Sequence, residues 1–135
     1  MEISKENRVK ILNEIQFAVK KMKEEKDDKA KLYYFSAIYG IMQRIFNTEY
    51  SGDLIFAHFV LSSTYNNLNS RLSNPDTVIR IPEDLFDKLT NVTEELKGAI
   101  EKNRNLYEVL KRYTILGYIT TGNGFYLYQK GLLKI

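Results

Sequence analysis

The spacing of apolar residues, at steps of three and four, is the feature that most limits how this chain can fold. Between residues 9 and 72 the pattern occurs three times, separated by polar or turn-forming segments. Because this spacing places apolar side chains on one face of an α-helix, it predicts three amphipathic helices. Three helices joined by short turns pack economically as an up-down bundle, which we expect for residues 1–73.

The three predicted helices differ in how much of their surface is apolar. We expect them over Lys5–Glu25, over Asp28–Asn47, and from a cap at Ser51 or Asp53 to Ser73. Ser4 precedes the first helix and is a residue type that caps helix N termini. Apolar residues cover most of the circumference of the second helix, and such a helix is usually central. We therefore expect the second helix at the centre of the bundle.

The segment that follows allows two interpretations. Val78–Ile81 is a short β-branched stretch, and Pro82 suits the first position of a further helix. Apolar residues then continue at steps of three and four as far as Tyr113, which favours one long helix. The alternative breaks this helix around Thr90-Asn91 and around Lys102–Asn105, where weak helix formers occur.

The end of the chain is basic. From residue 109 onward it contains no Asp or Glu, and residues 97–135 hold seven Lys and Arg against two Glu, a net charge of +5. The whole chain carries only +3. Because the positive charge gathers in the last third, that part could face a polyanion.

A β-hairpin is predicted at the same end. Residues 114–121 are rich in β-branched and aromatic side chains, Gly122-Asn123-Gly124 tolerates the positive φ of a tight turn, and Phe125–Gln129 resumes a strand-like pattern. The expected fold class is therefore mainly α, a helical bundle with a small C-terminal β-hairpin, in one domain spanning residues 1–135.

The last third resembles winged-helix DNA-binding domains. The resemblance rests on Leu106–Arg112, which is similar to a recognition helix, on Leu116–Ile119, similar to the junction between helix and wing, and on Gly124–Gly131, similar to a returning wing strand. It implies a winged-helix-like part over residues 82–135. It also implies that a helix from about Asn103 to Tyr113 enters the major groove while the hairpin touches the backbone.

The resemblance assigns roles to eight residues. Arg104, Asn105 and Glu108 would lie near base edges, Lys102, Lys111, Arg112 and Lys130 would meet phosphates, and Asn123 would add a contact at the wing tip. The implied protein is a small dimeric transcriptional regulator that binds double-stranded DNA.

The alternative function is a helical interaction or adaptor subunit that makes no contact with nucleic acid. Surplus apolar residues of the second helix, such as Tyr33, Tyr39 and Phe46, would then form an interface with another subunit or a second copy.

Enzymatic chemistry finds little support in the sequence. The chain has no Cys and a single His, His58 in an apolar stretch, so thiol chemistry and a His-based metal cluster are excluded. No Gly-rich phosphate loop follows a predicted strand. We expect a non-enzyme without cofactor or metal.

The charged N-terminal residues and the lack of roughly 18 consecutive apolar residues lead us to expect a cytoplasmic protein without a membrane span. The composition is thermophile-like.

Overall fold

The computed structural model describes residues 4–46, 53–133 and 135, with side chains placed for residues 4–45, 61–133 and 135. Within these residues the chain forms helices and no strand. The helices are α1 (Lys5–Glu24), α2 (Asp28–Phe46), α3 (Asp53–Ser73), α4 (Leu85–Glu101), α5 (Tyr107–Tyr118) and α6 (Gly122–Gln129). The predicted helical bundle is confirmed, and the first two helices end within one residue of the predicted ends.

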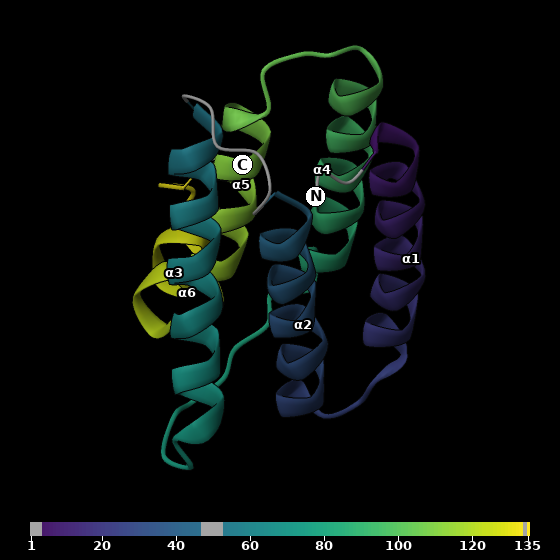
Figure 1. Ribbon diagram of the computed structural model, residues 1–135. Coiled ribbons are helices and arrows are strands. Elements are labelled where there is room, and N and C mark those ends of the chain that lie inside the picture. The colour runs from purple at the N-terminus through teal and green to yellow at the C-terminus, as the bar shows by residue number, and fades with distance from the viewer. Residues whose placement is uncertain (1–3, 47–52, 134) are drawn as a thin grey trace.

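Helices α1 to α5 form a closed ring. Along the ring α1 packs against α2, α2 against α3, α3 against α5, α5 against α4, and α4 against α1. Neighbours in the ring alternate in direction, except that α3 and α5 run the same way (Figure 1). One parallel pair is unavoidable because the ring has an odd number of members. A linker between α3 and α4 makes this arrangement possible.

The sixth helix lies outside the ring and is attached mainly through its aromatic side chains. The Tyr128 hydroxyl donates a hydrogen bond to the Asp84 carboxylate, and the Arg80 guanidinium lies 5.8 Å from the centre of the Phe125 ring. Both contacts join α6 to the end of the linker between α3 and α4.

Two buried tyrosines lie at the centre of the ring. Tyr39 from α2 meets Phe35 edge to face at 5.0 Å between ring centres, and it meets Tyr113 from α5 in the same way at 6.4 Å. The Tyr113 hydroxyl lies 2.5 Å from the Thr93 hydroxyl of α4. Because Thr93 donates its only hydroxyl proton to the Leu89 carbonyl, Tyr113 must donate to Thr93. The pair therefore links three helices across the core.

The two phenols differ in their hydrogen bonding. The Tyr39 hydroxyl is fully buried and finds no hydrogen-bond partner among the described residues. Burial, and after it the neighbouring Tyr113, raises the pKa of Tyr39 well above its ordinary value of 10.0, and the Gly117 backbone opposes part of this rise. Tyr39 therefore stays neutral without a well-formed hydrogen bond, whereas Tyr113 has one to Thr93.

The predicted C-terminal β-hairpin is wrong. Residues 114–118 continue α5, and the segment expected as a turn and a returning strand forms α6. Side chains of α5 at Val109, Tyr113 and Leu116 are buried at helical spacing, so burial on a helix overrides the preference of this segment for a strand. Without a hairpin, the winged-helix-like part predicted for residues 82–135 has no wing.

The turn residues of the predicted hairpin start a helix instead. The Thr121 hydroxyl accepts a hydrogen bond of 3.0 Å from the Gly124 amide, which is the pattern of a helix N-cap. Thr121 also donates to the Tyr118 carbonyl at the end of α5. One side chain therefore ends one helix and begins the next.

Of the two interpretations of residues 83–113, the break around Lys102–Asn105 is confirmed. Helix α4 runs unbroken through Thr90-Asn91 and ends at Glu101. Asn103 then adopts a left-handed φ of 53°, and the Arg104 amide donates to the Ala99 carbonyl at 2.9 Å. This is a Schellman ending with Asn in place of Gly. Helix α5 returns antiparallel to α4 (Figure 1).

The predicted central position of the second helix is wrong. Helix α2 is one wall of the ring, and it buries Leu32, Phe35, Ile38 and Met42 toward the interior. Its opposite side is open to solvent, where Tyr33 is 57% exposed. The helix is apolar all round because it has two apolar faces, and only one of them belongs to the core.

We expect the two central tyrosines to respond in opposite ways to loss of the hydroxyl. Tyr113→Phe removes the hydrogen bond to Thr93 and should lower the free energy of unfolding by about 1 kcal/mol. Tyr39→Phe removes a buried hydroxyl that lacks a well-formed hydrogen bond and should leave stability unchanged or raise it. Urea unfolding at pH 7 measures both. Greater destabilisation by Tyr39→Phe than by Tyr113→Phe would contradict this description of the core.

Candidate functional site

Five of the eight residues predicted to contact DNA gather at one end of the bundle. They occupy the turn between α4 and α5 and the start of α5, and all are exposed: Lys102, Arg104, Asn105, Glu108 and Lys111. This is the end drawn uppermost in Figure 1. The structure thus brings these five together, as the resemblance implied.

The charges at this end largely balance. Two exposed carboxylates, Glu101 and Glu108, lie in the same short stretch as Lys102, Arg104 and Lys111. The local excess is a single positive charge, which is a weak attraction for a polyanion at physiological salt.

The other three predicted residues lie elsewhere. Arg112 forms an ion pair with Glu95 of α4, so it ties α5 to α4 within the bundle. Asn123 begins α6, and Lys130 follows α6 with its Nζ atom 5.6 Å from the centre of the Tyr126 ring. The length of α5 separates α6 from the turn between α4 and α5 (Figure 1). The eight residues therefore do not form one surface.

A continuous apolar stripe covers the outer face of α2. It consists of residues at steps of three and four, Ala30, Tyr33, Tyr34, Ala37, Gly40 and Ile41, here called the outer stripe, and the exposed Arg44 follows it on the same face. Tyr33, Tyr34 and Ile41 are 57%, 37% and 39% exposed. Exposed apolar patches that are continuous mark contact sites in soluble proteins.

The outer stripe is flanked by two grooves near its C-terminal end. One, of about 310 Å³, lies between α1 and α2 beside Ile11 and Ala18. The other, of about 570 Å³, lies between α2 and α3 and is lined by Gly40 and Tyr65. Ile41 and Arg44 line both grooves. Ile41 is therefore a ridge between two hollows, a shape that suits insertion of side chains from a partner.

Only part of the predicted interface is exposed. Tyr33 is on the outer stripe as the alternative function requires, whereas Tyr39 is completely buried in the core. The side chain of Phe46 lies outside the described residues. The small residues Ala30, Ala37 and Gly40 were missed, although their spacing on the same helix face is visible in the sequence.

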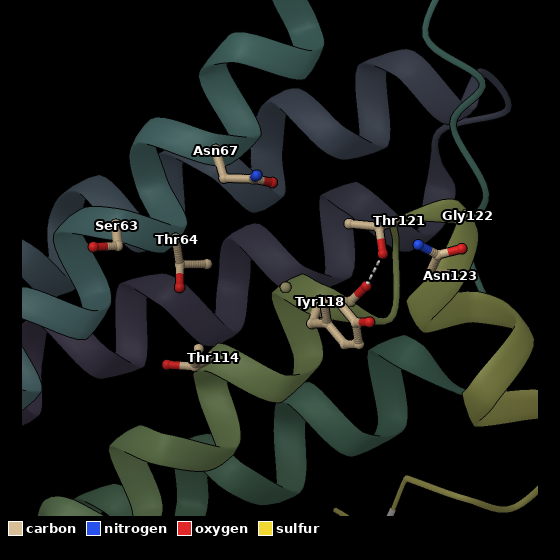
Figure 2. Close-up of a pocket in the computed structure, with 9 residues that line it drawn as sticks. Ser63, Thr64, Asn67, Thr114, Tyr118, Thr121, Gly122 and Asn123 are labelled. Atoms are coloured by element: carbon tan, nitrogen blue, oxygen red, sulfur yellow. Dashed lines mark hydrogen bonds between the residues drawn. The ribbon is translucent and has the colours of Figure 1, made fainter.

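A polar cleft lies at the other side of the ring, between α3, α5 and the start of α6 (Figure 2). Its volume is about 560 Å³. Helix α3 contributes Ser63, Thr64 and Asn67, and α5 contributes Thr114, Gly117 and Tyr118. The remaining lining comes from Thr121, Gly122 and Asn123. Hydroxyl and amide groups dominate the polar lining, and none of the described residues that line the cleft is acidic or basic.

Two glycines shape this cleft through close backbone approach. A Cβ atom on Gly117 would lie 2.6 Å from the Thr64 Cγ2 atom, so α3 and α5 can meet there only without a side chain. A Cβ atom on Gly124 would lie 2.0 Å from the Tyr118 carbonyl oxygen. The sharp connection from α5 into α6, and hence the end wall of the cleft, depends on that glycine.

Among the described residues, no group of three or more His, Asp or Glu side chains is placed to hold a metal ion. The side chain of His58 lies outside the described residues. Across residues 4–46 and 53–133, no helix combines the length and the apolar character that a membrane crossing requires.

Comparisons with protein-family models, with curated proteins and with solved structures gave no match to this chain.

Proposed function

We propose that this protein is a non-enzymatic interaction subunit that pairs with a second copy of itself through the outer stripe of α2. The observation that supports this proposal is the exposure of a full apolar helix face in a fold whose core is already closed. The inner face of α2 fills the ring, so the exposed side chains Tyr33 and Ile41 are not needed to fill the core of one copy.

The order of residues along the outer stripe is self-complementary. If two α2 helices pack antiparallel with Ala37 at a twofold axis, Tyr33 of one copy faces Ile41 of the other. In the same register Tyr34 faces Gly40. On both sides of the axis Tyr34 thus meets a small residue, and Tyr33 meets Ile41 beside the two grooves that Ile41 lines. A contact centred on the small residue Ala37 permits close approach of the two helices. Twofold pairing of identical surfaces is also the commonest form of oligomer.

The charges at the two ends of α2 complement each other in this register. The turn between α1 and α2 carries Glu24, Glu25, Asp27 and Asp28 against Lys26, whereas Arg44 is exposed near the other end of the helix. Antiparallel packing brings Arg44 of each copy toward the acidic turn of its partner. It also places the positive end of one helix dipole near the negative end of the other.

Substitution of Ala37 by Glu tests the pairing. Ala37 is exposed, so the single copy should keep its fold, but the change places two like charges together at the axis. We expect the dissociation constant to rise about a hundredfold, since such juxtaposition costs several kcal/mol. Sedimentation equilibrium should then show wild type at twice the 15.8 kDa chain mass and Ala37→Glu at the mass of one chain.

Val78→Glu is the matched control, because Val78 is 67% exposed but lies in the linker before α4. It should pair as wild type does. A wild-type protein that stays monomeric at about 100 μM, where a micromolar interaction would be saturated, would overturn the proposed function.

A second candidate function is binding of duplex DNA by the turn between α4 and α5. The observation that favours it is the break at Asn103, which leaves Lys102 and Arg104 exposed beside the first turn of α5. A plot of the logarithm of the duplex binding constant against the logarithm of the salt concentration has a slope that grows with the number of phosphate contacts. If these cations meet phosphates, the double variant Lys102→Ala/Arg104→Ala should reduce the magnitude of this slope by about 2. Fluorescence anisotropy across salt concentrations measures this slope. Absence of wild-type binding at low salt would exclude the function.

A further inference from the structure

The first turn of α6 contains the only Asn-Gly pair of the sequence, Asn123-Gly124. In such a pair the glycine amide nitrogen can attack the asparagine side-chain carbonyl, because the glycine has no side chain that hinders the approach. Asn123 is exposed at one end of the polar cleft, so water and hydroxide reach it (Figure 2). The pair is therefore a chemically reactive point on the surface of the protein.

The fold requires the glycine of this pair. A Cβ atom on Gly124 would lie 2.0 Å from the Tyr118 carbonyl oxygen and 2.6 Å from the Tyr118 carbonyl carbon. Both atoms belong to the backbone of α5, so they cannot move aside as the end of a flexible side chain would. By contrast, a Cβ atom on Gly122 would meet no neighbour within 4 Å. The sharp turn from α5 into α6 thus keeps a glycine directly after Asn123.

The folded first turn of α6 protects the same pair. The Gly124 amide, whose nitrogen must attack, donates a hydrogen bond of 3.0 Å to the Thr121 hydroxyl. The attack requires loss of the proton that this hydrogen bond holds. Asn123 also lies within α6, and helical backbone angles keep the next amide nitrogen out of position for attack on the Asn123 Cγ atom. Both forms of protection last only while the Thr121 cap is closed.

Helix α6 lies outside the closed ring, so its first turn can open while the core stays folded (Figure 1). Its tether to the linker before α4 consists of the hydrogen bond from Tyr128 to Asp84 and of the Arg80 guanidinium over the Phe125 ring. Peripheral elements open locally at a smaller free energy than global unfolding requires. The rate of reaction at Asn123 is then set by how often this turn opens.

We propose that Asn123 is a site of spontaneous deamidation and that the Thr121 cap controls its rate. In the open turn the Gly124 nitrogen loses its proton and forms a bond to the Asn123 Cγ atom, and the side-chain amide leaves as ammonia with that proton. The resulting succinimide takes up one water molecule, which opens the ring at either of its carbonyl carbons. The products are aspartate and isoaspartate at position 123, and no oxidant or reductant is consumed.

The two products differ in their effect on α6. Aspartate at position 123 adds a carboxylate to the first turn of a helix, where the helix dipole favours it. Isoaspartate carries the main chain through the Cβ atom and lengthens it by one atom between Thr121 and Gly124. The Gly124 amide then no longer fits the Thr121 hydroxyl. Formation of isoaspartate should therefore weaken the start of α6.

Peptide mapping by mass spectrometry, after incubation of the full chain in mildly alkaline buffer, measures the loss of Asn123. Thr121→Ala removes the cap and should speed this loss about fivefold, the factor by which a lost N-cap hydrogen bond raises the population of the open turn. Thr121→Ser keeps a capping hydroxyl and should react at about the wild-type rate. In urea all three chains should react at one common, faster rate, because the cap no longer acts.

Tyr128→Phe tests the opening of α6 at a distance from the reacting atoms. It removes the hydrogen bond to Asp84 and should also speed the loss of Asn123. Tyr126→Phe is the matched control, since it removes the hydroxyl of an exposed tyrosine of the same helix and should leave the rate unchanged.

An internal reference is Asn103, which is exposed but precedes Arg104, so it should be lost far more slowly than Asn123. Equal rates for folded wild type and folded Thr121→Ala would overturn the proposal. So would a wild-type rate that is the same with and without urea, or loss of Asn103 ahead of Asn123. None of these outcomes depends on pairing through α2.

Discussion

The close contact of α3 with α5 at Gly117 is the constraint on which the rest of this structure depends. A ring of five helices needs one parallel pair, and here that pair approaches so closely that a single Cβ atom would collide with Thr64. The approach brings Tyr113 toward Tyr39 and so closes the core around two tyrosines. It also forces the chain to turn sharply at Thr121, which creates the polar cleft and sets α6 outside the ring.

Because α1 to α5 close into a ring, the outer face of α2 remains on the surface. Five helices suffice to bury the inner face of α2, and among the described residues no further element covers its outer stripe. The antiparallel pairing that we propose would place the turns between α4 and α5 of the two copies at opposite ends of the assembly, because the C-terminal end of α2 lies at the same end as that turn (Figure 1). A single duplex would then meet only one such turn. This geometry favours the interaction subunit over a symmetric regulator of transcription.

The sequence predicted the N-terminal helices well because their signals are local. Helical spacing and the cap at Ser4 locate α1, and the Ser4 hydroxyl does accept from the Asn7 amide. The C-terminal part could not be predicted in the same way. Residues 114–120 prefer strands by composition, and only the packing of α5 against α3 makes them helical. Likewise, Thr121 followed by Gly-Asn-Gly fits a hairpin turn or a helix cap equally well, and the contact with Tyr118 decides between them.

The two candidate surfaces were visible in the sequence only in part. The apolar character of α2 was recognised, but a helix with two separate apolar faces has the same composition as a central one. The acid-free terminus pointed to an anionic partner, yet the structure distributes its basic residues over separate surfaces. The spacing of apolar residues along the chain cannot show which of the two apolar faces of α2 packs into the core.

The pairing of α2 is tested most directly by single cysteines, since the natural chain has none. If Ala37 lies at a twofold axis between antiparallel helices, Ala37→Cys should form a disulfide between two copies under mild oxidation, because only residues with Cα atoms within about 7 Å can be bridged. Val78→Cys should stay unlinked under the same conditions. Rapid, near-complete cross-linking of Ala37→Cys is the result we expect. Equal and slow cross-linking of both variants would contradict pairing through α2.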